Sequence, residues 1–151
     1  MGKAGKKEDE LLKEISDLRE CVVRFEKVDA ERKNVETALR QTEEKYRNMF
    51  ENATEGIFQT SIDGRFLSAN PSLARIHGYD SPEDLIRSIT NINRQLYVNP
   101  ANRVELVNLL KKHGVVQNFE VQMHRKDRSL QWILINIREV RDDRGNALYY
   151  E

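Results

Sequence analysis

Apolar residues in the first third of the chain follow the spacing of a coiled coil. They recur in alternating steps of four and three over residues 11–25, and a second series with the same spacing covers residues 28–49. Residues 6–52 contain no glycine or proline, so the sequence predicts one long helix there. The apolar stripe is too narrow for a helix that folds back onto its own domain, and we expect two copies to pair along it. The predicted dimer interface consists of Leu11, Ile15, Leu18, Val22, Phe25, Val28, Val35 and Leu39.

The two apolar series meet irregularly. Val22, Phe25 and Val28 follow one another in two successive steps of three, where a step of four is due. Such a stammer locally overwinds a coiled coil. The second series also has Arg32 and Thr42 at interface positions, which pack less well than apolar residues. The sequence therefore predicts a helix that packs less tightly against its partner in this region than a uniform heptad coil would.

Beyond residue 52 the pattern changes to short strands, turns and short helices. Strands are predicted at residues 56–62, 65–69, 116–125, 130–140 and from 147 to the end. Helices are predicted at residues 71–77, 82–87 and 100–113, because each begins with a proline and the first and last end at a glycine. This order predicts an α+β fold, an antiparallel sheet with helices gathered on one face. The strand at 130–140 is apolar enough to predict burial on both faces.

Charge and composition argue against several kinds of partner. Lys and Arg total 25, as do Asp and Glu, so no basic excess exists to bind nucleic acid or an anionic membrane. No apolar run reaches the roughly 18 to 20 residues that a membrane-spanning helix needs. The single cysteine, Cys21, has no partner for an intramolecular disulfide. We therefore expect a cytoplasmic protein with no nucleic-acid partner and no direct membrane contact by this segment.

No arrangement of residues typical of catalysis or metal binding is present in the sequence. It lacks a glycine-rich phosphate loop, a nucleophile elbow and a His-Glu metal motif. We therefore predict no catalytic residues and no metal site, and we do not expect this chain to be an enzyme.

Several segments of the second part resemble the PAS domain family, in particular a subgroup common in bacterial histidine kinases and nucleotide cyclases. The resemblance covers about residues 43–151 and implies a five-stranded antiparallel sheet whose concave face and short helices enclose a small pocket. The segments that carry it are residues 46–53, Glu55-Gly56-Ile57-Phe58, Asp63-Gly64-Arg65-Phe66, Asn70-Pro71, Gly78-Tyr79, Gln95-Leu96-Tyr97-Val98 and Trp132-Ile133.

The helical part is similar to the linker that commonly follows one PAS domain and leads into the next domain. The similarity covers residues 29–44, although Ala30 and Glu31 stand where Ile-Thr is usual. It implies a coiled-coil linker at 1–52 and a sensor domain at 53–151, whose last strand continues further in relatives. The chain then resembles a piece of a longer receptor, a homodimer through its N-terminal helix. Its neighbour in that receptor would be another PAS domain or an output domain, either a histidine kinase or a diguanylate cyclase.

Some PAS domains bind haem through a helical histidine or flavin beside a reactive cysteine. His77 and His113 each precede a glycine at a predicted helix end, where a histidine often faces water or a terminal carbonyl. Cys21 lies in the coiled coil, far from any flavin site. We therefore predict no haem or flavin cofactor and a colourless protein, with an unidentified small ligand as the remaining possibility.

The resemblance implies a mainly apolar pocket between the sheet and the helix at 100–113. Asn136 is a polar residue in an otherwise apolar strand, and a buried amide without a partner costs about 1–3 kcal/mol. Its partner is then a protein group, which we favour, or a ligand. Two functions remain open, a module that transmits ligand binding through the coiled coil and a ligand-free structural dimerisation and spacer domain. The residues expected to line the pocket are Phe58, Tyr97, Leu106, Leu110, Phe119, Met123, Trp132 and Asn136.

Overall fold

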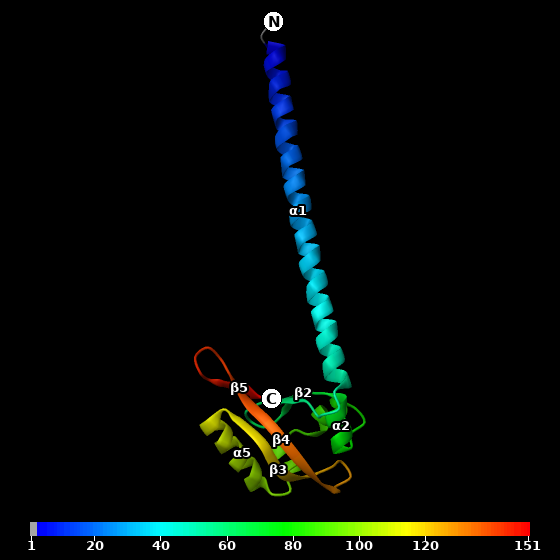
Figure 1. Cartoon of the computed structure of the whole chain (residues 1–151), viewed down its shortest axis with the longest axis vertical. Helices are drawn as coiled ribbons and strands as arrows, with labels where there is room; N and C mark the ends of the chain where they lie inside the picture. The colour runs from blue at the N-terminus through cyan, green and yellow to red at the C-terminus, as the bar shows by residue number, and fades with distance from the viewer. Residues whose placement is uncertain (1–2) are drawn as a thin grey trace. The chain divides into compact units, whose positions relative to one another are not determined.

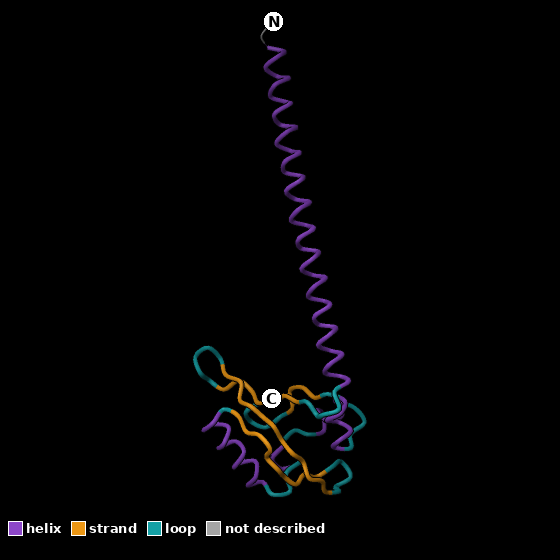
Figure 2. The backbone as a smooth tube through the Cα atoms, in the orientation of Figure 1, coloured by secondary structure: helices purple, strands orange, loops and turns teal. Residues whose placement is uncertain are grey.

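The N-terminal part of the chain is a single helix. The computed structural model describes residues 3–151, with side chains from residue 9 onward, so the first two residues of the predicted 1–52 linker lie outside the described residues. α1 (Lys3–Asn52) is continuous through the predicted helical region (Figure 2). The predicted interface side chains are exposed in the single chain, from 46% at Ile15 to 73% at Phe25. The pairing of two copies through these side chains stays a prediction.

Contacts within the chain define two units. The first ends at Arg47, and the second runs from Asn48 to Glu151. The last turn of α1 therefore belongs to the same unit as the strands, one turn earlier than the domain start expected at residue 53.

The second unit is built on a five-stranded antiparallel sheet. Its strands lie in the order β2-β1-β5-β4-β3, and every neighbouring pair is antiparallel. The last strand therefore lies at the centre of the sheet, between β1 and β4 (Figure 1). This arrangement confirms the predicted α+β fold. The strands are β1 (Phe58–Thr60), β2 (Phe66–Ala69), β3 (Val115–His124), β4 (Leu130–Arg141) and β5 (Ala147–Tyr150).

Short helices connect β2 to β3. They are α2 (Pro71–His77), α3 (Pro82–Ser88), α4 (Ile92–Gln95) and α5 (Pro100–His113). Each follows a Ser or Asn whose side-chain oxygen accepts a hydrogen bond from a backbone N–H in the first turn. Gly78 and Gly114 end α2 and α5 with φ of 78° and 76°, which a residue with a side chain rarely adopts. The predicted bounds of these two helices are confirmed, and α4 had no predicted bounds.

The two faces of the sheet differ in burial. α5 packs against β3 and β4 on one face (Figure 1), and the core lies beneath it. Along β4 the side chains alternate: Ile135 and Ile137 are buried, whereas Trp132 and Leu134 are 72% and 55% exposed. The expectation that this strand is buried on both faces is therefore wrong. An antiparallel sheet covered by helices on one side leaves its other side in contact with solvent.

Candidate ligand cavity

A cavity of about 50 Å³ lies inside the second unit, between the sheet and the helices. An engineered protein cavity of about 150 Å³ holds the six carbons of benzene, and a single water molecule needs at least about 10–15 Å³, so this cavity has room for about two to four non-hydrogen atoms. Its walls are mainly apolar, with polar atoms from a few side chains. The lining residues are Phe58, Thr60, Phe66, Leu73, His77, Ile92, Leu96, Tyr97, Arg103, Leu106, Met123, Ile133, Ile135 and Ile137.

The structure brings half of the predicted pocket residues together. Those that line the cavity are Phe58, Tyr97, Leu106 and Met123. Leu110 is fully buried in the core, and Phe119 is partly buried against that core, but neither reaches the cavity wall. That a ligand occupies this space stays a prediction.

Trp132 was expected in the pocket and instead lies on the open face of the sheet. It is directly opposite Gln122 on β3, and Leu134 is opposite Glu120. The cavity side of β4 carries Ile133 and Ile135, one residue out of phase with Trp132. Successive side chains of a strand point to opposite faces, so Trp132 cannot line the cavity.

Asn136 also faces away from the cavity and is not one of its lining residues, and the protein partner favoured for its amide is confirmed. It is exposed, and its Oδ1 accepts a hydrogen bond of 2.8 Å from the backbone N–H of Asn118. Asn118 has φ of 54° and lies where the β3–β4 register shifts between Val116 and Phe119. A bulge of this kind leaves a backbone N–H outside the ladder. Asn136 therefore satisfies that N–H, and its partner is a protein group.

The placement of Trp132 predicts a small effect on stability. Trp132→Ala should lower the free energy of unfolding by no more than about 1 kcal/mol, the scale of an exposed cross-strand pair. Leu106→Ala, which removes a fully buried side chain, should lower it by about 2–5 kcal/mol. Urea unfolding of both variants tests this, and a loss above about 3 kcal/mol for Trp132→Ala would show a buried indole.

Polar side chains of the cavity wall were missed in the sequence. Thr60, His77 and Arg103 are 2%, 3% and 7% exposed and all line the cavity. For Arg103 a signal was present, because it stands three residues before Leu106 and seven before Leu110. These three are the buried positions of α5 and form one stripe of the helix.

His77 is buried as a neutral side chain. Burial lowers its pKa to about 4, although a hydrogen bond with the backbone of His124 opposes the shift. Its Nδ1 lies 3.2 Å from the side-chain nitrogen of Gln131, which donates to it when the ring is neutral. The His77 ring is therefore buried against β3 and β4, not placed toward water or a terminal carbonyl as expected, whereas His113 is exposed.

The buried His77 makes stability depend on pH. Its pKa is about 4 in the folded chain and about 6.5 in the unfolded chain, so between these values only the unfolded state binds the proton. Stability therefore falls as the pH decreases through this window, by about 2 kcal/mol between about pH 7.5 and pH 5. Urea unfolding across that range should show the loss in the wild type and in His113→Gln, and a smaller loss in His77→Gln. Parallel curves for the wild type and His77→Gln would contradict it.

Arg103 extends from α5 into the cavity wall. Its guanidinium carbon lies 5.5 Å from the centre of the Tyr150 ring. Burial raises the pKa of Tyr97, and the charge of Arg103 and a hydrogen bond with it act in the opposite direction. Its Nη2 atom is buried and has no hydrogen-bond partner among the residues that the structure describes. Thr60 Oγ1 and the Tyr150 hydroxyl are likewise buried and have no hydrogen-bond partner among the described residues.

Asn70 connects the cavity wall to the end of α1. Its Oδ1 accepts hydrogen bonds from the backbone N–H groups of Ile57 and Leu73, at 2.9 and 3.0 Å. Its Nδ2 donates to the carbonyl oxygens of Phe50 and Glu55, at 3.1 and 2.9 Å. Asn70 caps α2, whose Leu73 and His77 line the cavity. One buried amide thus joins the last turn of α1 to the helix that forms the cavity wall.

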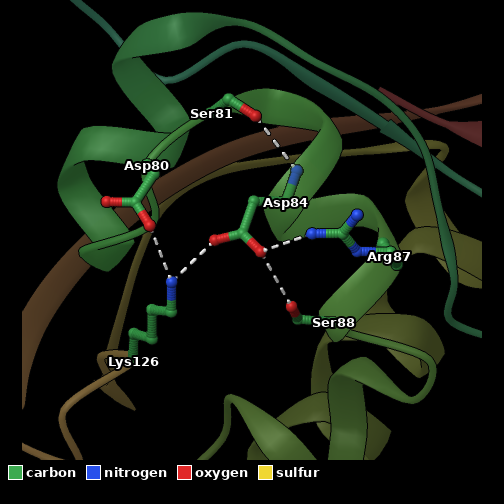
Figure 3. Close-up of polar contacts among 6 residues, drawn as sticks. All are labelled: Asp80, Ser81, Asp84, Arg87, Ser88 and Lys126. Atoms are coloured by element: carbon green, nitrogen blue, oxygen red, sulfur yellow. Dashed lines mark hydrogen bonds and ion pairs between the residues drawn. The ribbon is translucent and has the colours of Figure 1, made fainter.

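A polar cluster on the surface ties the β3–β4 turn to α3 (Figure 3). Lys126 Nζ donates to carboxylate oxygens of Asp84 and Asp80, at 2.7 and 3.1 Å. These two hydrogen bonds raise the pKa of Lys126. The hydrogen bond between Lys126 and Asp84 also lowers the pKa of Asp84. A lowered carboxyl pKa contributes stability at neutral pH that is lost in acid. Asp84 also accepts from Arg87 and Ser88, so its oxygens are occupied within the fold.

Residues 3–151 contain neither a metal-binding cluster nor a membrane-spanning helix. No group of three or more His, Cys, Asp or Glu in the described part of the chain could hold a metal ion. Among the helices described, none is long and apolar enough to cross a membrane.

Comparison with known proteins identifies the family. The family model for the PAS domain matches residues 54–150, well over half of the chain. This chain therefore belongs to the PAS domain family, whose members are typically sensory rather than catalytic. No curated protein matches the chain.

Solved structures share the fold. The PAS domain of a protein from Colwellia psychrerythraea has a TM-score of 0.59 and 19% identity, over 71% of this chain and 89% of that one. A PAS domain from a two-component sensor histidine kinase has a TM-score of 0.56 and 14% identity, over 74% and 92%. The PAS domain of a LuxR-family transcriptional regulator from Burkholderia thailandensis, in complex with ethanol, has a TM-score of 0.55 and 20% identity, over 70% and 91%.

Proposed function

We propose that this chain is a sensory and dimerising module. A small molecule in the cavity changes the position of α2, α2 changes the packing of the last turn of α1, and a parallel coiled coil of two α1 helices carries the change onward. The observation that supports this is the chain of contacts from the cavity to α1. Leu73 and His77 of α2 line the cavity, and the α2 cap Asn70 donates a hydrogen bond to Phe50 of α1.

The same proposal includes an output domain and a cellular compartment for the module. A histidine kinase is the preferred output domain, because a PAS domain of a sensor histidine kinase is among the similar structures. A diguanylate cyclase is the alternative that the sequence subgroup suggests. We place the module in the cytoplasm, where the exposed thiol of Cys21 stays reduced.

A ligand-free dimerisation and spacer domain is the second candidate. The observation in its favour is the cavity volume, because pockets for larger ligands usually measure about 300–1,000 Å³. A cavity of about 50 Å³ still admits a molecule the size of ethanol, which the Burkholderia domain holds. The two candidates differ in one respect: only the sensory module changes α1 when the cavity is filled.

Hydrogen exchange with a substituted cavity separates the two functions. Leu106→Phe adds volume at a cavity-lining position and imitates an occupied cavity, at a cost within about 1 kcal/mol if it fills the void. Val104→Phe adds the same ring at an exposed position of the same helix. We expect amide exchange at residues 48–57 to change in Leu106→Phe and not in Val104→Phe. Unchanged exchange at these residues in a folded Leu106→Phe would favour the spacer.

A further inference from the structure

The cavity contains a positive charge without a counter-charge. Arg103 is the charged member of the lining, since His77 is neutral near pH 7 because burial lowers its pKa, and a tyrosine such as Tyr97 is neutral at that pH in any case. No ion pair joins Arg103 to a carboxylate among the described residues. Glu139 is close enough to raise the pKa of Tyr150, yet its carboxylate pairs with Arg141.

A buried guanidinium group that has no carboxylate partner is unfavourable unless something neutralises its charge. Removal from water costs a charged group far more free energy than a neutral polar group, and apolar cavity walls offset little of that cost. The ring of Tyr150 offsets part of it through a cation–π contact. Nη2 nevertheless keeps an unused N–H donor, and Thr60 Oγ1, on the same cavity wall, is an unused hydroxyl. These groups are suited to binding the oxygens of an anion.

The rest of the cavity is suited to a hydrocarbon group. Leu73, Leu106, Met123 and Ile135 are apolar lining residues, so an anion that also carries a methyl group matches the cavity better than a fully polar ion. Guanidinium groups bind carboxylates through paired N–H donors in one plane. The volume limits such a ligand to about two to four non-hydrogen atoms.

We propose that the ligand of this PAS domain is a short monocarboxylate, of the size of formate or acetate, held by Arg103 and Thr60 with its hydrocarbon part against Leu106 and Met123. This inference rests on the proposed sensory function and specifies the ligand class. Thr60 is next to Tyr150 in the sheet register, so the anion lies at the centre of the sheet beside the last strand. Neutral molecules of the same shape lack the charge that Arg103 requires.

Methionine methyl NMR of the full chain tests the proposal. The chain has three methionines, and Met123 is the one that lines the cavity, so its methyl signal reports on a molecule bound there. Sodium acetate should shift the Met123 signal saturably, and sodium chloride at equal ionic strength should not. Acetamide, the neutral analogue, should bind at least about tenfold more weakly than acetate.

Variants of the charged residue separate binding in the cavity from general salt effects. Arg103→Met should weaken acetate binding at least about tenfold, while Lys111→Met, which removes an exposed charge from the same helix, should leave it unchanged. If Arg103→Met does not fold, Arg103→Lys keeps the charge but loses the paired donors and should show intermediate affinity. Acetate affinity that is equal in Arg103→Met and the wild type would overturn the proposal.

The outcomes also separate this inference from the proposed function. Saturable binding of ethanol or acetamide with no preference for acetate would overturn the carboxylate assignment and leave the sensory function standing. Absence of saturable binding by acetate would overturn the assignment as well. Only if Leu106→Phe also left residues 48–57 unchanged would the sensory function fail with it.

Discussion

A variant with Leu18→Asp and Leu39→Asp should be monomeric at micromolar concentrations at which the wild type is a dimer. Both leucines are predicted interface positions and are exposed in the single chain, at 60% and 58%. In a parallel pair of helices each aspartate would be buried against its copy without a partner, which is strongly unfavourable. Sedimentation equilibrium should show the dimer dissociation constant rising at least about a hundredfold.

The control for this variant carries the same charges elsewhere on the helix. Ser16→Asp with Thr37→Asp places two aspartates outside the interface series, at positions that face solvent in the predicted dimer. This control should remain dimeric. A wild type that stays monomeric over the whole concentration range would refute the coiled-coil dimer, as would equal dissociation of both variants.

Asn70→Ala should be among the most damaging single substitutions in the second unit. The side chain is fully buried and makes four hydrogen bonds with backbone groups of Phe50, Glu55, Ile57 and Leu73. Truncation leaves these groups with fewer partners, and we expect the free energy of unfolding to fall by about 3 kcal/mol. Urea unfolding monitored by circular dichroism of the sheet measures the loss.

Two further variants show which hydrogen bonds of Asn70 matter. Asn99→Ala removes an exposed cap of α5 that accepts from Ala101 alone, and should cost about 0.5–1 kcal/mol. Asn70→Asp keeps the acceptor for Ile57 and Leu73 but faces the carbonyl oxygens of Phe50 and Glu55 with a second acceptor. It should therefore also destabilise strongly. If Asn70→Ala cost no more than Asn99→Ala, Asn70 would be an ordinary helix cap.

Local sequence signals predicted most of the fold because the residues that define its elements are adjacent in the chain. Asn70, Pro71 and Gly78 specify the start and end of α2 within a few residues, and α5 is bounded equally clearly. α4 is shorter, with one turn between Asn91 and Leu96, and its residues carry no periodic pattern that could set its bounds. The family resemblance supplied the topology that these local signals leave open.

The site was predicted less well because its residues meet through contacts distant in sequence. The position of Trp132 depends on strand register, which pairs it with Gln122 on the face of β3 that also carries Glu120. Trp132 and Leu134 are apolar although they lie on the exposed face, so the residue types of β4 do not show which of its side chains face the core. The donors of Asn70 reach back 20 residues to Phe50, and no local pattern indicates that contact.

Arg103 was overlooked for a different reason. Arginine is rarely buried without a partner, so its residue type alone does not indicate a place in the cavity wall. Its position in the stripe with Leu106 and Leu110 was visible in the sequence, and a charged residue at such a position is a candidate ligand-binding group.

Coupling between the cavity and the coiled coil can be measured as the distance between two spin labels on the α1 helices when the cavity is filled. Cys21 is the single cysteine and is exposed on α1, so one label per chain gives one distance in the dimer by double electron–electron resonance. If the cavity is coupled to the coiled coil, the distance distribution in Leu106→Phe differs from that of the wild type, while that of Val104→Phe does not. Identical distributions in all three folded dimers would contradict coupling between the cavity and the coiled coil, and would leave this chain as a spacer.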